Sequence, residues 1–469
     1  QWRPGREAVS HEILLSMDPA AVQDGSALVA IANENTYAPD PLIYGTTYTW
    51  QVNEIYEAEE YSSYLGDPWT FTTPEYAVID NFDQYDNDCE RIFFTWLDGW
   101  GHNGAADCGI APFAGNGTGA VVGNLDAPFA EKRIVKSGSA LSLTYDNSMS
   151  PFYSEVESAA FALPSDWTPG AAQTLSLSFR GRPVGFRENT DGSITMSGMG
   201  ADIADTTDEG HFAYRELTGD GTITVRLDSL QDVRDSTKAG VMIRETLFPW
   251  SKNVYLSGTP RNLTQFQYRG ATAGNTVEIA SSENATPLPV WLRLTRAGRV
   301  FTAQRSQDGV NWESITTDES ASRTTITMCN PLYVGLAVTS HDIEIPAVAE
   351  FSHVSFSGQV SDRWQLEAMT VEQVSNDPES IYLGIADDRG GIAVITHPDP
   401  AATQIATWTE WRIPMSHFVA VDLSNVQKVF LGVGDRDNPT SGGKGKLYIE
   451  DIRIGTPLPL AEDAYPSLE

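Results

Sequence analysis

A stretch in the second quarter of the chain, QTLSLSFRGRP at residues 173–183, shows most plainly which kind of fold the sequence encodes. Leu175, Leu177 and Phe179 occupy every second position, with small polar residues between them. Because successive side chains of a strand point to opposite faces, this alternation predicts a half-buried β-strand with Arg180 on its outer face. The same alternation recurs elsewhere in the chain, in SGSALSLTYDN (137–147) and in LIYGTTYTWQV (42–52).

The composition points to the same fold class across the whole chain. Its 469 residues include 39 glycines and 26 prolines, and threonine, serine, valine and aromatic residues recur throughout. Such residues favour short strands joined by tight turns over long helices. At roughly 150 residues per domain, the length suggests about three domains. We therefore predict an all-β protein built from three β-sandwich modules.

The charge balance argues against two classes of partner. Lysine and arginine number 30 against 63 aspartates and glutamates, which gives a net charge of −33. A surface this negative is repelled by nucleic-acid phosphates and by anionic lipid headgroups. The chain also lacks a run of about 18 apolar residues that could span a membrane. We therefore expect neither nucleic-acid binding nor membrane insertion.

Two of the three cysteines lie close together in a loop-rich segment. A disulfide between Cys89 and Cys108 is one interpretation, and it fits an oxidising compartment outside the cytoplasm. Two free thiols are the alternative. Cys329 stands in the apolar run ITMCNPLYVGLAV (326–338) and is predicted to be a small core residue. No CxxC motif is present, so a zinc ribbon is excluded.

Residues 1–75 form a short unit that opens like the middle of a domain. Its strand at 42–52 follows the pattern Leu-x-x-Gly-x-x-Tyr, which ends at Tyr48. This pattern resembles the sixth strand and the tyrosine corner of a fibronectin type III domain. The resemblance implies that Trp2 is the core tryptophan of the second strand. It also implies that the first strand is missing, so that one sheet edge is left open.

Two short stretches that lie far apart in the sequence resemble two strands that are close together in one known fold. VIDNFD at 78–83 and LYIEDIR at 447–453 are similar to the first and last strands of jelly-roll carbohydrate-binding modules of the galactose-binding-like type. In such modules these two strands lie close together. The resemblance therefore implies one discontinuous jelly roll, made of residues 76–187 and 376–456.

The intervening residues 188–375 are then an inserted domain. Paired arginine-rich segments, LRLTRAG (292–298) and RVFTAQRS (299–306), are followed by an Asp-Gly turn at 308–309. This order resembles concanavalin A-like, laminin-G-like sandwiches of bacterial extracellular glycan-active proteins. Insertion is tolerated because the ends of a sandwich often lie close together. The acidic, proline-containing residues 457–469 read as a tail.

Familiar catalytic motifs are missing from the sequence. It contains no G-x-S-x-G elbow, P-loop or H-E-x-x-H motif. The nearest match to the Glu-x-Asp-x-Glu pattern of retaining glucanases is SHDIE at 340–344, which has Ser in place of the first carboxylate. The absence of these motifs favours a non-catalytic protein over an enzyme.

The jelly-roll resemblance also implies a structural calcium ion where the first and last strands meet. Calcium binds six to eight hard oxygen ligands. Asp80, Asp83 and Asp451 fall on the matching positions, although Asp83 replaces a longer glutamate. The alternative interpretation is that these are ordinary exposed carboxylates.

Sugar recognition needs aromatic platforms and planar hydrogen-bonding side chains. Strand alternation predicts that one set of such residues faces outward from the jelly roll, namely Arg180, Tyr382, Trp408 and Arg412. A second set lies in the loop TWLDGWGHNG at 95–104, where Asp98, Trp100 and His102 are candidates to contact a ligand at one rim. The alternative for each is a plain surface or core position.

Three functions remain open on the sequence alone. The first is an extracellular or cell-surface, bacterial, non-catalytic region that binds a polysaccharide or cell-surface glycan. The second is a structural subunit of a surface layer or filament, which would contact copies of itself or neighbouring domains through the open sheet edge. The third is a polysaccharide-active enzyme of unfamiliar type.

Overall fold

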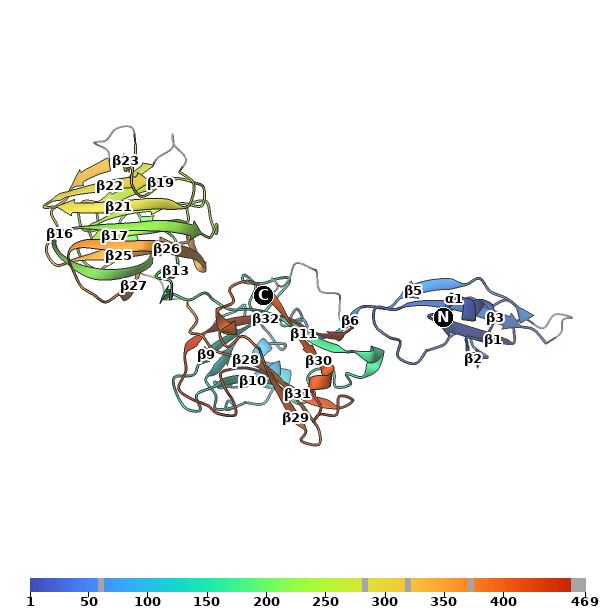
Figure 1. The fold of residues 1–469 in the computed structure, drawn as a ribbon. Coiled ribbons are helices and arrows are strands. Elements are labelled where there is room, and N and C mark those ends of the chain that lie inside the picture. Colours follow the sequence, from blue (N-terminus) through green and yellow to red (C-terminus); the bar gives the residue numbers. More distant parts are fainter. Residues whose placement is uncertain (58–62, 281–285, 317–321, 370–374, 457–469) are drawn as a thin grey trace.

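A computed structural model describes residues 1–57, 63–280, 286–316, 322–369 and 375–456. Nearly all regular elements in these ranges are strands, and α-helix is limited to the short α1 (Pro19–Gln23) and α2 (Ile92–Thr95). The prediction of an all-β protein is therefore confirmed. Figure 1 shows a blue N-terminal unit and a green-to-orange unit on either side of a middle unit that combines early and late segments of the chain.

The N-terminal unit is one five-stranded antiparallel sheet. Its order is β2-β1-β3-β4, with β5 also pairing to β3. The phenol oxygen of Tyr48 accepts a hydrogen bond from the backbone N–H of Ile43 at 3.2 Å, which is the geometry of a tyrosine corner. The strands are β1 (Ser10–Ser16), β2 (Leu28–Ala32), β3 (Thr47–Ile55), β4 (Ser63–Tyr64) and β5 (Trp69–Thr72).

Trp2 does not occupy the position that the sequence suggested. It lies in the irregular segment before β1 rather than in a second strand, and its indole is only partly buried. The ring stands edge-on to the imidazole of His11, with 5.2 Å between ring centroids. Residues 1–9 contain no strand that could carry the indole into the core of the sheet.

The middle unit is a sandwich of two antiparallel sheets. The β31 sheet has the order β29-β28-β31-β10-β7, and the β11 sheet has the order β30-β11-β32-β9-β8 with β6 pairing to β32. Each sheet mixes strands from before residue 187 with strands from after residue 376. The bounds are β6 (Tyr76–Asp80), β7 (Trp96–Leu97), β8 (Ala120–Val122), β9 (Leu141–Asp146), β10 (Ser154–Ser158), β11 (Thr174–Arg180), β28 (Ile381–Asp387), β29 (Ile392–Thr396), β30 (Thr409–Pro414), β31 (Val426–Val433) and β32 (Lys444–Gly455).

The core of this sandwich is filled by the alternating residues that the sequence pattern singled out. Leu175, Leu177 and Phe179 of β11 are at most 2% exposed, and the apolar residues of β9 pack beside them. The first and last strands meet directly, because Ala77 pairs with Ile454 and Asp80 pairs with Ile452. Residues far apart in the sequence therefore share one apolar core.

The unit between these two segments has its own core. Its long strand β16 (Gly210–Leu230) pairs with β25 and β27 in its first half and with β21 and β26 in its second half, so that one strand serves two layers. β12 (Phe186–Glu188) already belongs to this unit. The other strands include β13 (Ile194–Gly200), β17 (Lys238–Arg244), β18 (Asn253–Gly258), β19 (Thr264–Arg269), β20 (Val277–Ala280), β21 (Val290–Ala297), β22 (Val300–Ser306), β25 (Leu332–Thr339), β26 (Asp342–Val360) and β27 (Gln365–Met369).

Cys329 is exposed, so its expected place in the core is wrong. Ile326 and Met328 point inward, with 4% and 6% of their surface exposed. Alternation therefore turns Cys329 outward, and the buried run begins only with Leu332 at the start of β25.

Candidate functional site

A cavity of the middle unit lies at one rim of the sandwich, over the 95–104 loop. It encloses about 710 Å³. Aromatic rings dominate its wall, and one cation, one carboxylate and one imidazole accompany them. The lining side chains that matter below are Arg91, Phe93, Phe94, Asp98, Trp100, His102, Phe113, Leu125 and Phe129. We call this cavity the aromatic pocket.

Asp98 shapes the floor of the aromatic pocket instead of facing a ligand. Its carboxylate is 5% exposed and accepts backbone hydrogen bonds from Trp100 (3.0 Å), Gly101 (2.7 Å) and Val122 (2.8 Å). Gly101 has φ = +76°, and a Cβ atom there would lie 2.3 Å from the carbonyl oxygen of Phe113. Asp98 is therefore a positioning residue that folds the loop into a tight turn.

His102 is held at the centre of the aromatic wall. Its backbone forms a two-way bridge with Phe113, and its Nδ1 accepts the backbone N–H of Gly104 at 3.1 Å. Its ring lies 4.9 Å from that of Phe94. Burial lowers the pKa of the imidazole, and the nearby Asp98 charge opposes that shift only in part. A neutral ring whose Nδ1 accepts carries its proton on Nε2, so His102 offers a donor.

Trp100 and Arg91 line the aromatic pocket from different sides. The indole of Trp100 is 66% exposed, an uncommon arrangement for a tryptophan. The guanidinium of Arg91 lies over the rings of Phe94 and Phe129, at 5.5 Å and 5.2 Å from their centroids. The pocket thus offers an exposed aromatic surface on one residue and a cation stacked on two others.

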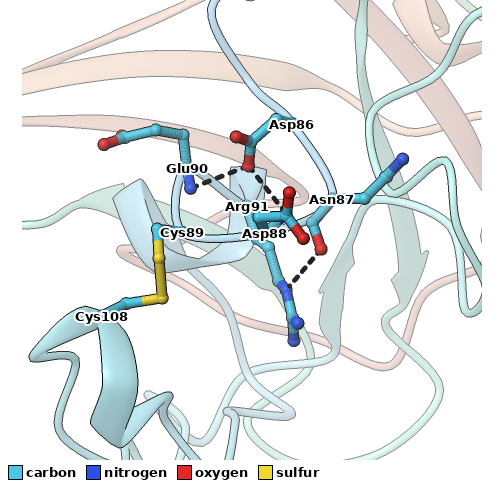
Figure 2. Close-up of a disulfide and its surroundings, with 7 residues drawn as sticks. All are labelled: Asp86, Asn87, Asp88, Cys89, Glu90, Arg91 and Cys108. Carbon is cyan, nitrogen blue, oxygen red and sulfur yellow. Dashed lines mark hydrogen bonds between the residues drawn. A yellow bond between two sulfur atoms is a disulfide. The ribbon is translucent and has the colours of Figure 1, made fainter.

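A disulfide holds the segment that carries Arg91. Cys89 and Cys108 are bonded to each other (Figure 2). In the same segment, Asp86 accepts the backbone N–H groups of Asp88 and Glu90, and the Nε of Arg91 donates to the carbonyl of Asn87 at 3.1 Å. These bonds fix a segment that has little regular secondary structure of its own.

Sequence reasoning found three residues of the aromatic pocket and missed others, among them its cation and several of its phenylalanines. Asp98, Trp100 and His102 come together there, whereas Arg91, Phe93, Phe94 and Phe129 were not expected. The run RIFFTW reads as a strand, but it folds as the single-turn helix α2, which lets both phenylalanines contact the pocket. The signal in the sequence for this part of the pocket was the adjacent pair Phe93 and Phe94, which lies close to Cys89.

The four residues that strand alternation placed on the outer face of the jelly roll, Arg180, Tyr382, Trp408 and Arg412, do not come together in one site. Tyr382 lies on the outer face of the β31 sheet but is only 2% exposed. Its hydroxyl donates to Glu155 at 2.7 Å, and burial together with that carboxylate raises the pKa of the phenol. A Cβ atom at Gly432 would lie 2.0 Å from the Tyr382 ring, so the missing side chain makes room for it. Tyr382 is thus not presented to a ligand.

Arg180, Trp408 and Arg412 lie on or beside the β11 sheet, away from the residues that line the aromatic pocket. Arg180 is partly buried and pairs across the sheet with Tyr448 of β32. Trp408 is half-buried, just before β30. Arg412 is ion-paired to Glu410 at 2.6 Å and borders a cavity of only about 50 Å³. That cavity is too small for a sugar ring.

The carboxylates predicted to bind calcium are engaged with protein donors. Asp80 is 2% exposed and accepts hydrogen bonds from Phe82, Gln84, Tyr85 and Trp96. Its four acceptor sites are thus filled by the strand and loop around it.

The other two predicted ligands also have partners. Asp83 accepts from the backbone N–H of Ser139 at 2.9 Å, and Asp451 is ion-paired with Lys136 at 3.2 Å and Arg453 at 2.5 Å. Within the described ranges, no group of three His, Cys, Asp or Glu residues is arranged to hold a metal. The donor set in this arrangement does not fit a calcium ion, and calcium binding stays a prediction from the sequence.

The glucanase-like stretch at 340–344 is also structural. Asp342 begins β26 and is ion-paired with Arg234 at 2.6 Å. Glu344 is ion-paired with Arg133 of the middle unit. These carboxylates therefore link elements of the fold, and they do not face each other across a cleft.

Among the described residues, no helix has both the length and the apolar character needed to cross a lipid bilayer.

Comparison with known proteins finds only distant structural similarity. No family model and no curated protein matches the sequence. A functionally unknown protein from Saccharomyces cerevisiae is 17% identical over 39% of this chain and 97% of its own, with a TM-score of 0.29. An alginate lyase from Klebsiella pneumoniae is 11% identical over 39% and 95%, with a TM-score of 0.25. The GH43 protein BlXynB from Bacillus licheniformis is 11% identical over 71% and 68%, with a TM-score of 0.27. TM-scores this low carry no argument about function.

Proposed function

We propose that the aromatic pocket binds a sugar ring of a polysaccharide or cell-surface glycan, and that the chain is a non-catalytic glycan-binding region. The supporting observation is the composition of a cavity of about 710 Å³ that lies within the size range of small-molecule sites. A sugar presents an apolar face that stacks on aromatic rings and a rim of hydroxyls that needs fixed polar partners. Trp100 offers the ring, and His102 and Arg91 offer the donors.

The carboxylate chemistry of the pocket favours binding over hydrolysis. Glycosidases use a pair of carboxyl groups on either side of the scissile bond. Asp98 is the one carboxylate among the described lining residues, and three backbone N–H groups already engage it. The disulfide between Cys89 and Cys108 supports an extracellular or cell-surface location, where such bonds persist.

The test is affinity electrophoresis and calorimetry of the whole chain against a panel of neutral and acidic polysaccharides. Trp100→Ala should weaken binding by about tenfold or more, because an exposed tryptophan at a binding site often carries much of the affinity. The matched control is Trp250→Ala, since Trp250 is 44% exposed and belongs to the inserted unit. Release of new reducing ends or unsaturated products would instead establish an enzyme.

A second candidate function is assembly through the N-terminal unit. Its single sheet leaves large apolar side chains in solvent, including Ile31 (61%), Leu65 (77%) and Trp69 (64%). Exposed apolar residues of this kind often mark interaction surfaces. Light scattering after size-exclusion chromatography, with and without a chelator, tests it. A strict monomer in both conditions removes this candidate.

A further inference from the structure

A second cavity adjoins the aromatic pocket on the other side of one loop. It encloses about 450 Å³ and shares Asn124 and Leu125 with the aromatic pocket. The ridge between the two cavities carries Leu125, which is 72% exposed, beside the polar Asn124. A ligand made of linked units can therefore occupy one cavity with one unit and the other cavity with a neighbouring unit.

The wall of this second cavity is rich in cations. Four of its lining residues are basic, namely Lys132, Arg133, Arg182 and Lys446. The chain as a whole has 30 basic residues against 63 acidic ones, so a concentration of basic side chains around one cavity departs from the general trend. We call this cavity the basic pocket.

Three acidic residues line the same cavity: Asp126 is exposed to solvent, whereas Glu131 and Glu344 are bound to protein groups. Glu131 is 7% exposed, and its Oε1 accepts the backbone N–H groups of Arg133 and Ile134 at 2.7 Å and 3.2 Å. Glu344 is ion-paired with Arg133. The described residues place no carboxylate within ion-pair distance of Lys132 or Arg182. Their positive charges therefore remain available to a ligand.

Arg182 is held in position by an uncharged group. Its Nε and one terminal nitrogen donate to the hydroxyl of Tyr448 at 3.2 Å and 2.6 Å. The guanidinium also lies 5.6 Å from the centre of the Tyr448 ring, which is buried. Such a contact orients the side chain without neutralising it.

Arg180 adds a further positive charge at this edge of the sheet. It pairs across the strands with Tyr448, the residue that holds Arg182. Burial lowers the pKa of the Arg180 guanidinium, and the Arg182 charge lowers it further. Arg180 does not itself line the basic pocket, so it adds to the positive field there without contacting the cavity.

We propose that the basic pocket is a second subsite, which binds the carboxylate or sulfate of an acidic sugar unit in the same glycan that places a neighbouring ring in the aromatic pocket. This inference rests on the proposed glycan-binding function and specifies its substrate class as an acidic polysaccharide. The aromatic pocket supplies stacking, and Lys132 and Arg182 select the anionic unit by charge-assisted hydrogen bonds.

The experiment compares polymers that differ only in charge. Isothermal titration calorimetry would use polygalacturonate against its methyl ester, and fucoidan against its desulfated form. We expect the charged member of at least one pair to bind about tenfold more tightly, with a preference that falls as salt rises. The pair that shows the preference tells a carboxylate from a sulfate. Lys132→Gln and Arg182→Gln should each remove most of this preference, measured as the ratio of the two affinities.

Two controls separate the subsite from general effects. Arg299→Gln removes one charge from an exposed turn of the inserted unit and should change neither affinity. Lys132 is exposed, so Lys132→Gln keeps the test valid if Arg182→Gln fails to fold.

The outcomes also separate this inference from the proposed function. Equal affinity for charged and uncharged polymers, or unchanged preference in both variants, overturns the basic subsite. If that happens while Trp100→Ala still weakens binding, glycan binding at the aromatic pocket stands alone. If neutral polysaccharides bind and none of the acidic ones does, the same conclusion holds. Failure of every polymer to bind overturns both.

Discussion

Asp98 illustrates how one buried carboxylate can build a binding pocket without touching what binds there. Its two oxygens accept three backbone N–H groups, two from its own loop and one from β8. The loop therefore has a single well-defined shape before any ligand arrives. Trp100, two positions later, is left to face solvent. The two residues lie almost next to each other in the sequence and perform different tasks.

Asp98→Asn should destabilise the fold and weaken glycan binding together. The amide retains one acceptor oxygen, so at least one backbone N–H loses its partner, at a cost of about 1–3 kcal/mol. Thermal unfolding measures the first effect and calorimetric titration the second. Trp100→Ala is the comparison, since it should lower affinity while the unfolding temperature stays near that of the wild type. Equal behaviour of the two variants would contradict the positioning role.

His102 makes the stability of the middle unit depend on pH. Its pKa in the folded chain is lowered by burial, so the unfolded state binds the proton more readily. Stability should therefore fall as pH drops through the unfolded value of about 6.5 toward the lower folded value. Unfolding free energies of the wild type and His102→Gln between about pH 5 and 7.5 measure this difference. His397 also has a lowered pKa, and the comparison cancels its contribution. Parallel pH curves would contradict the assignment.

Elements with little regular structure depend on cross-links to carry functional side chains. The segment around Arg91 consists of turns and the single-turn helix α2. The disulfide joins it to the 3₁₀ helix at Ala106–Cys108, just beyond the loop that carries His102. Strands hold themselves by ladders of backbone bonds, whereas these connections need a covalent bond and side-chain acceptors to keep one shape.

Replacing both Cys89 and Cys108 by serine should cost about 3 kcal/mol of unfolding free energy, because the unfolded chain regains the freedom of the loop between them. Glycan affinity should fall as well, since Arg91 loses its anchored segment. Denaturant unfolding and calorimetric titration measure both. Cys329→Ser is the matched control, because its thiol is exposed and unbonded. Unchanged affinity in the double variant would show that the segment holds its shape without the disulfide.

A strand that alternates correctly can still hide its outward residues. Both faces of β28 are buried, and Tyr382 donates to the buried Glu155 of β10, two strands away. Arg436 lies 3.3 Å from the same carboxylate. This set stabilises the outer face of the β31 sheet and takes no part in the aromatic pocket.

Tyr382→Phe should therefore destabilise the chain and leave glycan affinity unchanged. Glu155 is 6% exposed and would lose a donor, at a cost of about 1–3 kcal/mol. A double-mutant cycle with Glu155→Gln measures the coupling by chemical unfolding. Additive effects would mean that the hydroxyl and the carboxylate do not interact. Lost glycan affinity in Tyr382→Phe would assign Tyr382 to a ligand site after all.

At the scale of the whole molecule, the main feature is that the middle unit is built from both ends of the chain. β6 and β32 pair directly, and the inserted unit leaves and re-enters between them. The basic pocket depends on this closure, because Arg182 and Lys446 come from different segments of the chain. Both pockets belong to the middle unit, with Glu344 the one lining residue from the insert.

The calcium prediction is tested at this scale. An ion bound by Asp80, Asp83 and Asp451 would raise the unfolding temperature in calcium relative to chelator, and Asp451→Ala would remove that shift. Asp451 would then have to release Lys136 and Arg453, its present partners. No shift in differential scanning calorimetry would leave the pairing of β6 with β32 intact and dismiss the metal.

Local patterns were sufficient to predict the alternating strands and the fold class, but not the helix α2, whose residues read as a strand. Alternation at Leu175, Leu177 and Phe179 reports which side of one strand meets the core, and that depends only on neighbouring residues. The cysteine pair and the loop with Trp100 and His102 were also visible in the sequence, because both are short-range features.

Only the tertiary structure decided which of the candidate residues meet. Alternation assigns Tyr382 to an outer face, but the neighbouring strands determine whether that face is covered. Arg91, Phe129 and His102 converge on one pocket because loops from separate strands pack at one rim, and Arg182 and Lys446 meet because the chain returns after the insertion. Periodicity is a property of one segment, whereas a site forms where several segments are brought together by a shared core. No local sequence pattern specifies which distant segments will meet.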